Sequence, residues 1–241
     1  MDFNCVIPAA GYGKRLLSLT IDTPKALLPL NEATVLDHIL SRLYELPHLG
    51  EICILTNETY FEKFRIWLNQ TEKSKITLIS NNVNDRNLAQ GANKDTWSAI
   101  NQVGWHDKDI LIMGSDNYMP ESLVECSKWF TNGKSSVVAT CDYSTKEKVK
   151  KLVVPEINEQ NIVTNIVEKP LEPNSTFGCP LIYFIKNKDL KYLELLAKEG
   201  RDNIGHLLEL IVKNSQLRAY VFKELIVDIG TLEDYTAIIK K

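Results

Sequence analysis

The chain has 241 residues, of which 44% are apolar and 24% are charged, as in a globular protein long enough to bury a full core. A formal net charge of −3 excludes the strongly basic surface that is typical of nucleic-acid-binding and membrane-surface proteins. The N-terminal residues MDFNCVIPAAG lack the basic and apolar regions of a targeting signal, and no apolar run approaches the roughly 20 residues of a membrane span.

Strand and helix patterns alternate over the first 145 residues. Brief apolar runs that are typical of buried parallel strands cover residues 3–8, 52–56, 76–80, 110–113 and 137–140. Apolar residues recur with a helical period over residues 35–43 and 60–68. The alternation predicts an α/β fold with a mainly parallel, doubly wound, Rossmann-like mixed sheet that is flanked by helices.

The pattern changes after residue 145. A β-hairpin is predicted for residues 149–155 and 162–167, which flank a polar turn. Further strands are expected at 181–185, 219–222 and 226–228, and helices at 189–198, 204–213 and 232–240. We expect one domain over residues 1–241, in which residues 1–145 hold a nucleotide and the smaller, β-rich part, 146–241, holds a co-substrate.

The cysteines are odd in number, widely spread and without a CxxC pair. Most lie in apolar runs, which predicts buried free thiols and a reducing cytoplasmic environment for Cys5, Cys53, Cys126, Cys141 and Cys179.

The loop after the first predicted strand is the most informative segment. It runs Ala9-Ala10-Gly11-Tyr12-Gly13-Lys14-Arg15-Leu16 and continues to Thr23-Pro24-Lys25. The small residues let backbone N–H groups approach an anion closely. The three cations of the segment, Lys14, Arg15 and Lys25, suit a triphosphate, which carries about four negative charges. The segment is not a P-loop, because Arg15 stands after Gly13-Lys14 where that motif has Ser or Thr. It is not a dinucleotide-binding fingerprint, because Leu16 stands in place of the third glycine. The glycines alone would also fit an ordinary strand-to-helix turn.

Two acids each follow or close an apolar run. Asp116 comes after residues 110–113 and precedes Asn117, and Asp228 closes residues 226–228. In a parallel sheet, ligands bind at the carboxyl ends of the strands, and paired carboxylates suit Mg²⁺. Taken singly, Asp116 could instead be a turn residue and Asp228 a helix cap.

These segments resemble the signature of the sugar-1-phosphate nucleotidylyltransferases, or NDP-sugar pyrophosphorylases. The family pattern G-x-G-T-R-L followed by P-K-x-L-x-P corresponds to residues 11–16 and 24–29, with Lys14 in place of Thr or Ser. Residues 228–231 match the family's D-x-G-T, and 168–170 match its E-K-P. The resemblance implies a GT-A-like, Rossmann-like NTP-transferase fold.

The resemblance also implies roles for individual residues. Catalytic contacts to phosphates fall to Arg15, Lys25 and Lys169, and Mg²⁺ ligation falls to Asp116 and Asp228. NTP contacts are expected from Ala10, Gly11, Tyr12, Gly13, Lys14, Asn82, Asn87 and Gln90. Acceptor contacts are expected from Glu168, which would bond sugar hydroxyls, Lys169, Asn117 and Gly178.

The implied activity is Mg²⁺-dependent transfer of a nucleotide from an NTP to a sugar 1-phosphate. Two alternatives remain open: cytidylyl transfer to a non-sugar alcohol phosphate such as choline or inositol phosphate, and a catalytically silent subunit that binds a sugar nucleotide. The expected partners are the two small-molecule substrates, without nucleic acid or membrane. The sequence leaves the base, the acceptor and the formation of a homo-oligomer open.

Overall fold

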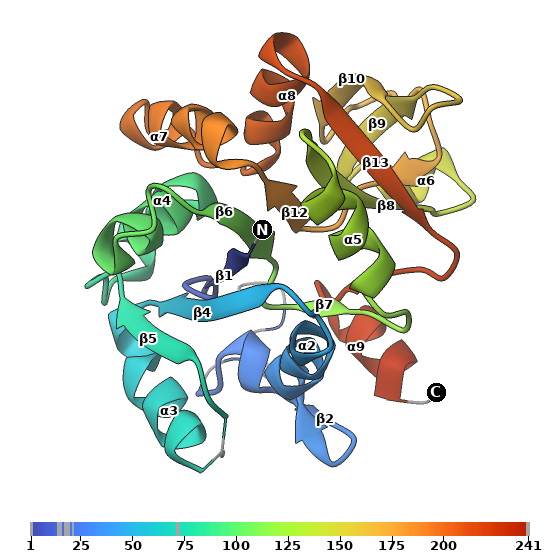
Figure 1. The fold of residues 1–241 in the computed structure, drawn as a ribbon. Helices are drawn as coiled ribbons and strands as arrows, with labels where there is room; N and C mark the ends of the chain where they lie inside the picture. The colour runs from blue at the N-terminus through green and yellow to red at the C-terminus, as the bar shows by residue number, and fades with distance from the viewer. Residues whose placement is uncertain (1, 14–15, 17–19, 21, 71–72, 240–241) are drawn as a thin grey trace.

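The computed structural model describes residues 2–13, 16, 20, 22–70 and 73–239, which form a central sheet covered by helices (Figure 1). The strands of the sheet follow the order β11-β8-β12-β6-β1-β4-β5, and β13 also pairs with β8. Their bounds are β1 (Phe3–Pro8), β4 (Leu49–Thr56), β5 (Ile76–Ser80), β6 (Asp109–Met113), β8 (Ser136–Asp142), β11 (Phe177–Gly178), β12 (Ile182–Ile185) and β13 (Leu217–Phe222).

Most pairings in this sheet are parallel. Strand β1 runs parallel to β4 and β6, β4 to β5, and β13 to β8, whereas β12 and β11 pair antiparallel with their neighbours. The predicted α/β class and the mainly parallel mixed sheet are therefore confirmed. Strands β12 and β13 come from the second half of the chain, so residues from both halves build one sheet.

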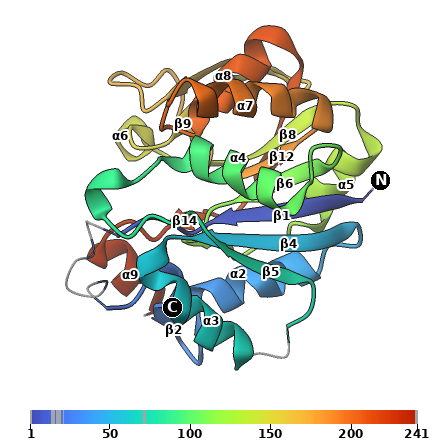
Figure 2. The same cartoon turned by 90° about the vertical axis from the view of Figure 1, so that its left-hand side faces the viewer.

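Helices cover both faces of the sheet because its strands are apolar on both faces. Within β1, Phe3 and Cys5 belong to one core and Val6 to the other. The first core is covered by α2 (Val35–Tyr44), α3 (Glu58–Asn69), α5 (Val124–Asn132) and α9 (Leu232–Ile239). The second is covered by α4 (Ala92–Val103), α7 (Leu190–Lys198) and α8 (Gly205–Asn214), which lie on the opposite side of the sheet (Figure 2).

Three short antiparallel pairs lie outside the central sheet. They are β2 (Pro29–Leu30) with β3 (Ala33–Thr34), β7 (Asn117–Tyr118) with β14 (Val227–Asp228), and β9 (Val153–Ile157) with β10 (Val163–Glu168). The pair β9–β10 is the predicted hairpin, but its first strand begins four residues later than expected. Val149 is buried as the last residue of a short helix, α6 (Lys146–Val149), and not in a strand.

All five cysteines are buried free thiols, as predicted. Burial raises the pKa of each thiol, and that of Cys53 to about 12, so these groups stay protonated and pack as small apolar side chains. Among the residues that the structure describes, no helix has the length and apolar character needed to cross a membrane.

Candidate active site

A pocket of about 370 Å³ opens where β1 and β6 end. Its walls come from the loop after β1, the start of α4 and the turn after β6. Predicted site residues in these walls are Ala10, Gly11, Gly13, Lys25 and Asp116. The pocket therefore lies at the carboxyl ends of parallel strands, where the sheet topology predicts a ligand site.

The loop after β1 leaves space for a ligand close to its backbone. A side chain at Gly11 would meet nothing within 4 Å, and Gly13 has a φ of +57°, which suits glycine. The Thr20 hydroxyl donates to the Gly13 carbonyl at 3.0 Å, and the Asn57 amide donates to the Ala10 carbonyl at 2.9 Å. These bonds fix the loop around an open concavity. Lys14 and Arg15, both predicted phosphate contacts, lie outside the described residues.

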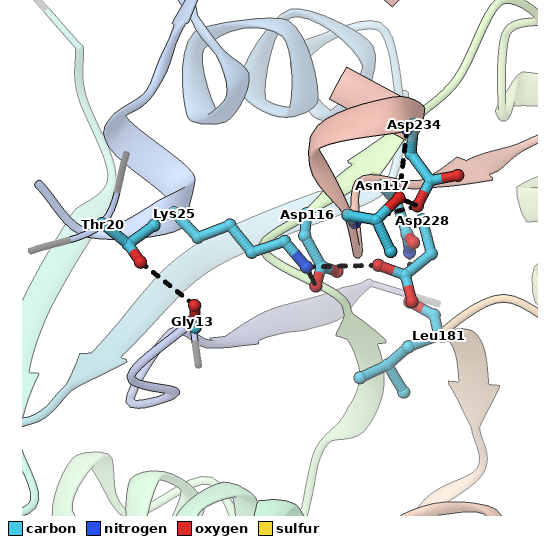
Figure 3. A network of polar contacts seen from close by, with 9 residues as sticks. Gly13, Thr20, Lys25, Asp116, Asn117, Leu181, Asp228 and Asp234 are labelled. Atoms are coloured by element: carbon cyan, nitrogen blue, oxygen red, sulfur yellow. Dashed lines mark hydrogen bonds and ion pairs between the residues drawn. The ribbon is translucent and has the colours of Figure 1, made fainter. Parts of the chain in front are cut away.

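The ammonium of Lys25 contacts both predicted metal-binding carboxylates (Figure 3). Its Nζ is 2.5 Å from Asp116 Oδ2 and 3.3 Å from Asp228 Oδ1. The side chain of Lys25 is only 14% exposed, so this cluster is partly shielded from water. The structure thus brings together three predicted site residues that are 91 and 203 positions apart in the chain.

Backbone pairing holds the two acids next to each other. Asp228 lies opposite Asn117 in the β7–β14 ladder, and the Ile229 N–H donates to the Asp116 carbonyl at 2.9 Å. Thr231, and not Asp228, caps α9. The Thr231 hydroxyl accepts from the Asp234 N–H, and the Thr231 N–H and hydroxyl donate to Asp234 Oδ2. The helix-cap alternative for Asp228 is therefore wrong.

The electrostatics of the cluster favour a cation. Burial lowers the pKa of Lys25, but the Asp116 and Asp228 carboxylates outweigh burial, so the net shift is upward and the ammonium stays charged. Burial and the Asp116 carboxylate raise the pKa of Asp228 to about 6, while Lys25 opposes the shift. Two carboxylates that share one ammonium keep a negative charge near neutral pH.

These two acids form the donor set that a divalent cation would use. Carboxylate oxygens are hard ligands, and Mg²⁺ commonly binds one or two of them together with substrate phosphates and water. Within the described residues there is no cluster of three or more His, Cys, Asp or Glu side chains that could hold a metal. Asp116 and Asp228 fit Mg²⁺ in combination with a bound nucleotide, which supplies the other oxygens.

Asn117, predicted to contact the acceptor, uses its amide inside the protein. It is 2% exposed, and its Nδ2 donates to the Leu181 carbonyl at 3.0 Å. The bond joins the turn after β6 to the residue that precedes β12. Gly178 is also away from the pocket walls that the structure describes. A Cβ there would meet Leu152 Cδ1 at 2.7 Å, so this glycine serves close packing.

The stretch that holds the predicted NTP contacts Asn82, Asn87 and Gln90 borders the pocket through two other residues. Asn82 and Asn87 are exposed, and Gln90 is half-buried, in the stretch that leads to α4. Ala89 and Gly91 from this stretch line the pocket. Tyr12 is buried beneath it, where its hydroxyl donates to the Val83 carbonyl at 3.2 Å.

Asp95 is a pocket residue that the sequence analysis missed. It is 7% exposed on the first turn of α4, and the Asn81 amide donates to its Oδ1 at 2.9 Å. Burial raises its pKa although the amide bond and Lys94 oppose the shift. The signal in the sequence was an acid four residues after a glycine, Gly91. In the structure Gly91 lies at the start of α4 with a φ of +83°.

Glu168 and Lys169 form a second polar centre at the end of β10. Lys169 Nζ is 2.9 Å from Glu168 Oε1 and 3.1 Å from Asn203 Oδ1. Lys169 has a φ of +48°, and its N–H donates to the Leu152 carbonyl at 2.9 Å, so the backbone is held in an unusual conformation. Glu168 is 8% exposed, and its Oε2 is buried without a hydrogen-bond partner among the described residues.

Residues 201–205 connect this centre with the pocket. The Ala92 N–H donates to the Asp202 carbonyl at 3.2 Å, and the Asn93 amide donates to the carbonyls of Arg201 and Asn203, both at 2.8 Å. Asn203 in turn accepts from Lys169. The structure thus joins the pocket wall at α4 to the Glu168–Lys169 pair through one short loop.

Comparisons with known proteins agree with this architecture. Residues 4–241 match the model of the nucleotidyl transferase family. The bifunctional protein GlmU of Methanococcus vannielii is 25% identical over 222 residues, which cover 89% of this chain and 49% of that protein. A bifunctional sugar-1-phosphate nucleotidylyltransferase/acetyltransferase of Sulfurisphaera tokodaii is 24% identical over 228 residues, covering 93% and 51%. The chain spans about half the length of these curated relatives.

Solved structures share the fold. A putative glucose-1-phosphate thymidylyltransferase from Bacillus anthracis aligns with a TM-score of 0.86 at 21% identity, over 98% of this chain and 94% of that one. A UDP-glucose pyrophosphorylase complexed with UDP-glucose aligns with a TM-score of 0.84 at 20% identity, over 100% and 98%. With a family model that matches almost its whole length, the chain belongs to the nucleotidyl transferase family.

Proposed function

We propose that this chain transfers a nucleoside monophosphate from an NTP to a sugar 1-phosphate and releases pyrophosphate. The observation that carries the proposal is the cluster of Lys25, Asp116 and Asp228 beside the open glycine loop. It combines a cation site with an anion-binding backbone, as a metal–triphosphate complex requires. The names of the relatives, which include a sugar-1-phosphate nucleotidylyltransferase, support this choice of reaction.

The reaction needs little covalent help from the protein. A sugar 1-phosphate is largely dianionic at neutral pH, because its second pKa is about 6, so its oxygen is already nucleophilic without a general base. The main task is to bring two anions together and to stabilise charge on the attacked α-phosphate. Lys25 and Arg15 would bind the NTP phosphates, and Lys169 would bind the acceptor's phosphate. Asp116 and Asp228 would hold Mg²⁺, which supplies charge neutralisation when it is bound.

Glu168 supports a sugar as the acceptor. Its side chain is only 8% exposed, and its Oε1 lies 2.9 Å from the Nζ of Lys169, whose side chain is 50% exposed. Oε2 lies against Gly205, so a sugar hydroxyl would donate to Oε1, next to the ammonium that would bind the acceptor's phosphate. The free thiols of the buried cysteines support a location in the reducing cytoplasm.

Substitutions at Glu168 and Lys169 should have different effects on different acceptors. We expect Lys169→Ala to weaken transfer to every phosphorylated acceptor, because all of them share the phosphate. Glu168→Ala should lower kcat/KM for a sugar 1-phosphate about 10- to 100-fold, the effect of losing a charge-assisted bond of about 1.5–3 kcal/mol. Choline phosphate has no alcohol hydroxyl, so the value of kcat/KM for choline phosphate should change little. The measurement is kcat/KM for both acceptors at a fixed NTP concentration.

Lys150→Ala is the matched control for these variants. It removes an exposed lysine that pairs with Glu147 in the same half of the chain, and both kcat/KM values should stay at the wild-type level. Equal losses on both acceptors after Glu168→Ala would remove the support for a sugar.

A further inference from the structure

Helix α8 begins at a glycine because the Glu168 carboxylate occupies the space of a side chain. An ideal Cβ on Gly205 would lie 1.6 Å from Glu168 Oε2 and 2.5 Å from Val153 Cγ2. The first contact is far below any real Cβ contact, so Glu168 and a larger residue at 205 cannot both keep their places. The position also sets the carboxylate against the positive end of the helix, which stabilises a negative charge.

A second residue of α8 holds the backbone of Glu168. Glu209, which lies one turn after Gly205, accepts a hydrogen bond at Oε1 from the Glu168 N–H at 3.0 Å. The N–H of the next residue, Lys169, donates to the Leu152 carbonyl. Two residues of α8 thus hold Glu168 in place. Gly205, 37 positions later in the chain, packs against its carboxylate, and Glu209, 41 positions later, binds its main chain.

We propose that Gly205 and Glu209 are positioning residues of the acceptor site. Because Gly205 has no side chain, the Glu168 carboxylate can pack against the start of α8. Glu209 fixes the position of the end of β10, which carries Glu168 and Lys169. This inference rests on the proposed function, because it assigns to α8 the placement of the two acceptor-binding side chains. Neither residue touches the NTP pocket in the described structure, so their effect should be confined to the acceptor.

Two substitutions of Glu209 test the hydrogen bond. Glu209→Gln keeps an oxygen that accepts from the Glu168 N–H, whereas Glu209→Met keeps the length of the side chain and loses the acceptor. We expect Glu209→Met to raise KM for the sugar 1-phosphate about 10-fold, with KM for the NTP unchanged, and Glu209→Gln to restore the low acceptor KM. Glu194→Met on α7 is the matched control. Glu194 forms an ion pair with Lys198 on the surface of its own helix, so both KM values should be unaffected.

A double-mutant cycle tests Gly205. Gly205→Ala should raise the acceptor KM in the wild-type background and have no further effect in the Glu168→Ala background, where the clashing carboxylate is gone. The contact with Val153 is common to both backgrounds and cancels in the cycle. Thermal melting with and without glucose 1-phosphate provides a second readout, since a bound acceptor raises Tm whether or not it reacts.

The outcomes separate this inference from the function on which it rests. Equal rises of both KM values, a Glu209→Gln variant that behaves like Glu209→Met, or additive effects of Gly205→Ala and Glu168→Ala would each overturn the positioning role while transfer to the sugar persists. A wild-type protein that neither binds nor uses any sugar 1-phosphate would overturn the proposed function and the positioning role together.

Discussion

Replacing Lys25 with alanine is expected to lower turnover about 100-fold or more, the scale of losing one preorganised electrostatic group. Lys25 is the described cation closest to the proposed metal and phosphate site, and its Nζ contacts both Asp116 and Asp228. Without it, charge on the attacked phosphate would lose a stabilising partner. The measurement is the steady-state rate of pyrophosphate release at saturating substrates.

The same substitution should also have a stability signature. It leaves two partly buried carboxylates without their ammonium, so the free energy of unfolding should fall in metal-free buffer, and added Mg²⁺ should restore part of it. Lys73→Ala is the control. Lys73 forms an ion pair with Asp37, and the two side chains are 22% and 20% exposed, similar to Lys25 and Asp116, but neither residue lines the described pocket. That variant should keep its turnover. A Lys25→Ala protein with near-wild-type rates would contradict the role of the cluster.

Removal of divalent cations should abolish the reaction. Asp116 and Asp228 are proposed to ligate Mg²⁺, and two phosphorylated substrates cannot be brought together without charge neutralisation. Excess EDTA should eliminate turnover, and added Mg²⁺ or Mn²⁺ should restore it. Asp228→Asn should remain nearly inactive after the metal is added back, because the amide is a neutral and weaker ligand.

Asp107→Asn is the control for the acid substitution, since Asp107 is 78% exposed and forms an ion pair with the neighbouring Lys108. Its metal dependence should equal that of the wild type. Full turnover in excess EDTA would contradict the assignment of both carboxylates.

The central sheet was predictable because its strands are buried on both faces. Strands of this kind are continuous apolar runs, as in β1 and β6, and the helices that cover one face, α2 and α3, show a clear apolar period. Helix α4 was not predicted because its buried face is partly polar. Asn93, Asp95 and Thr96 are buried there, and the Asn93 amide donates to the carbonyls of residues 201 and 203, which only the folded chain brings close.

Asp116 and Asp228 could be selected from their place after or at the end of apolar runs, but the cation that joins them could not. The prediction that Lys25 contacts phosphates did not indicate that its ammonium also lies on Asp116 and Asp228. That contact depends on the pairing of β7 with β14. A strand was predicted at residues 226–228, but its two-residue partner β7 was not. Gly205 was likewise invisible, because a glycine at the start of a helix has many explanations until the Glu168 carboxylate is seen beside it.

Nucleotidyl transfer to a sugar 1-phosphate underlies all of these predictions, and a pyrophosphate-release assay measures this reaction. The wild-type protein is incubated with Mg²⁺ and each of ATP, CTP, GTP, UTP and dTTP against sugar 1-phosphates, choline phosphate and inositol phosphate. We predict acceptor-dependent release of pyrophosphate with at least one sugar 1-phosphate, and formation of the matching NDP-sugar. Release with choline phosphate or inositol phosphate alone, or no release with any pair, would contradict the account.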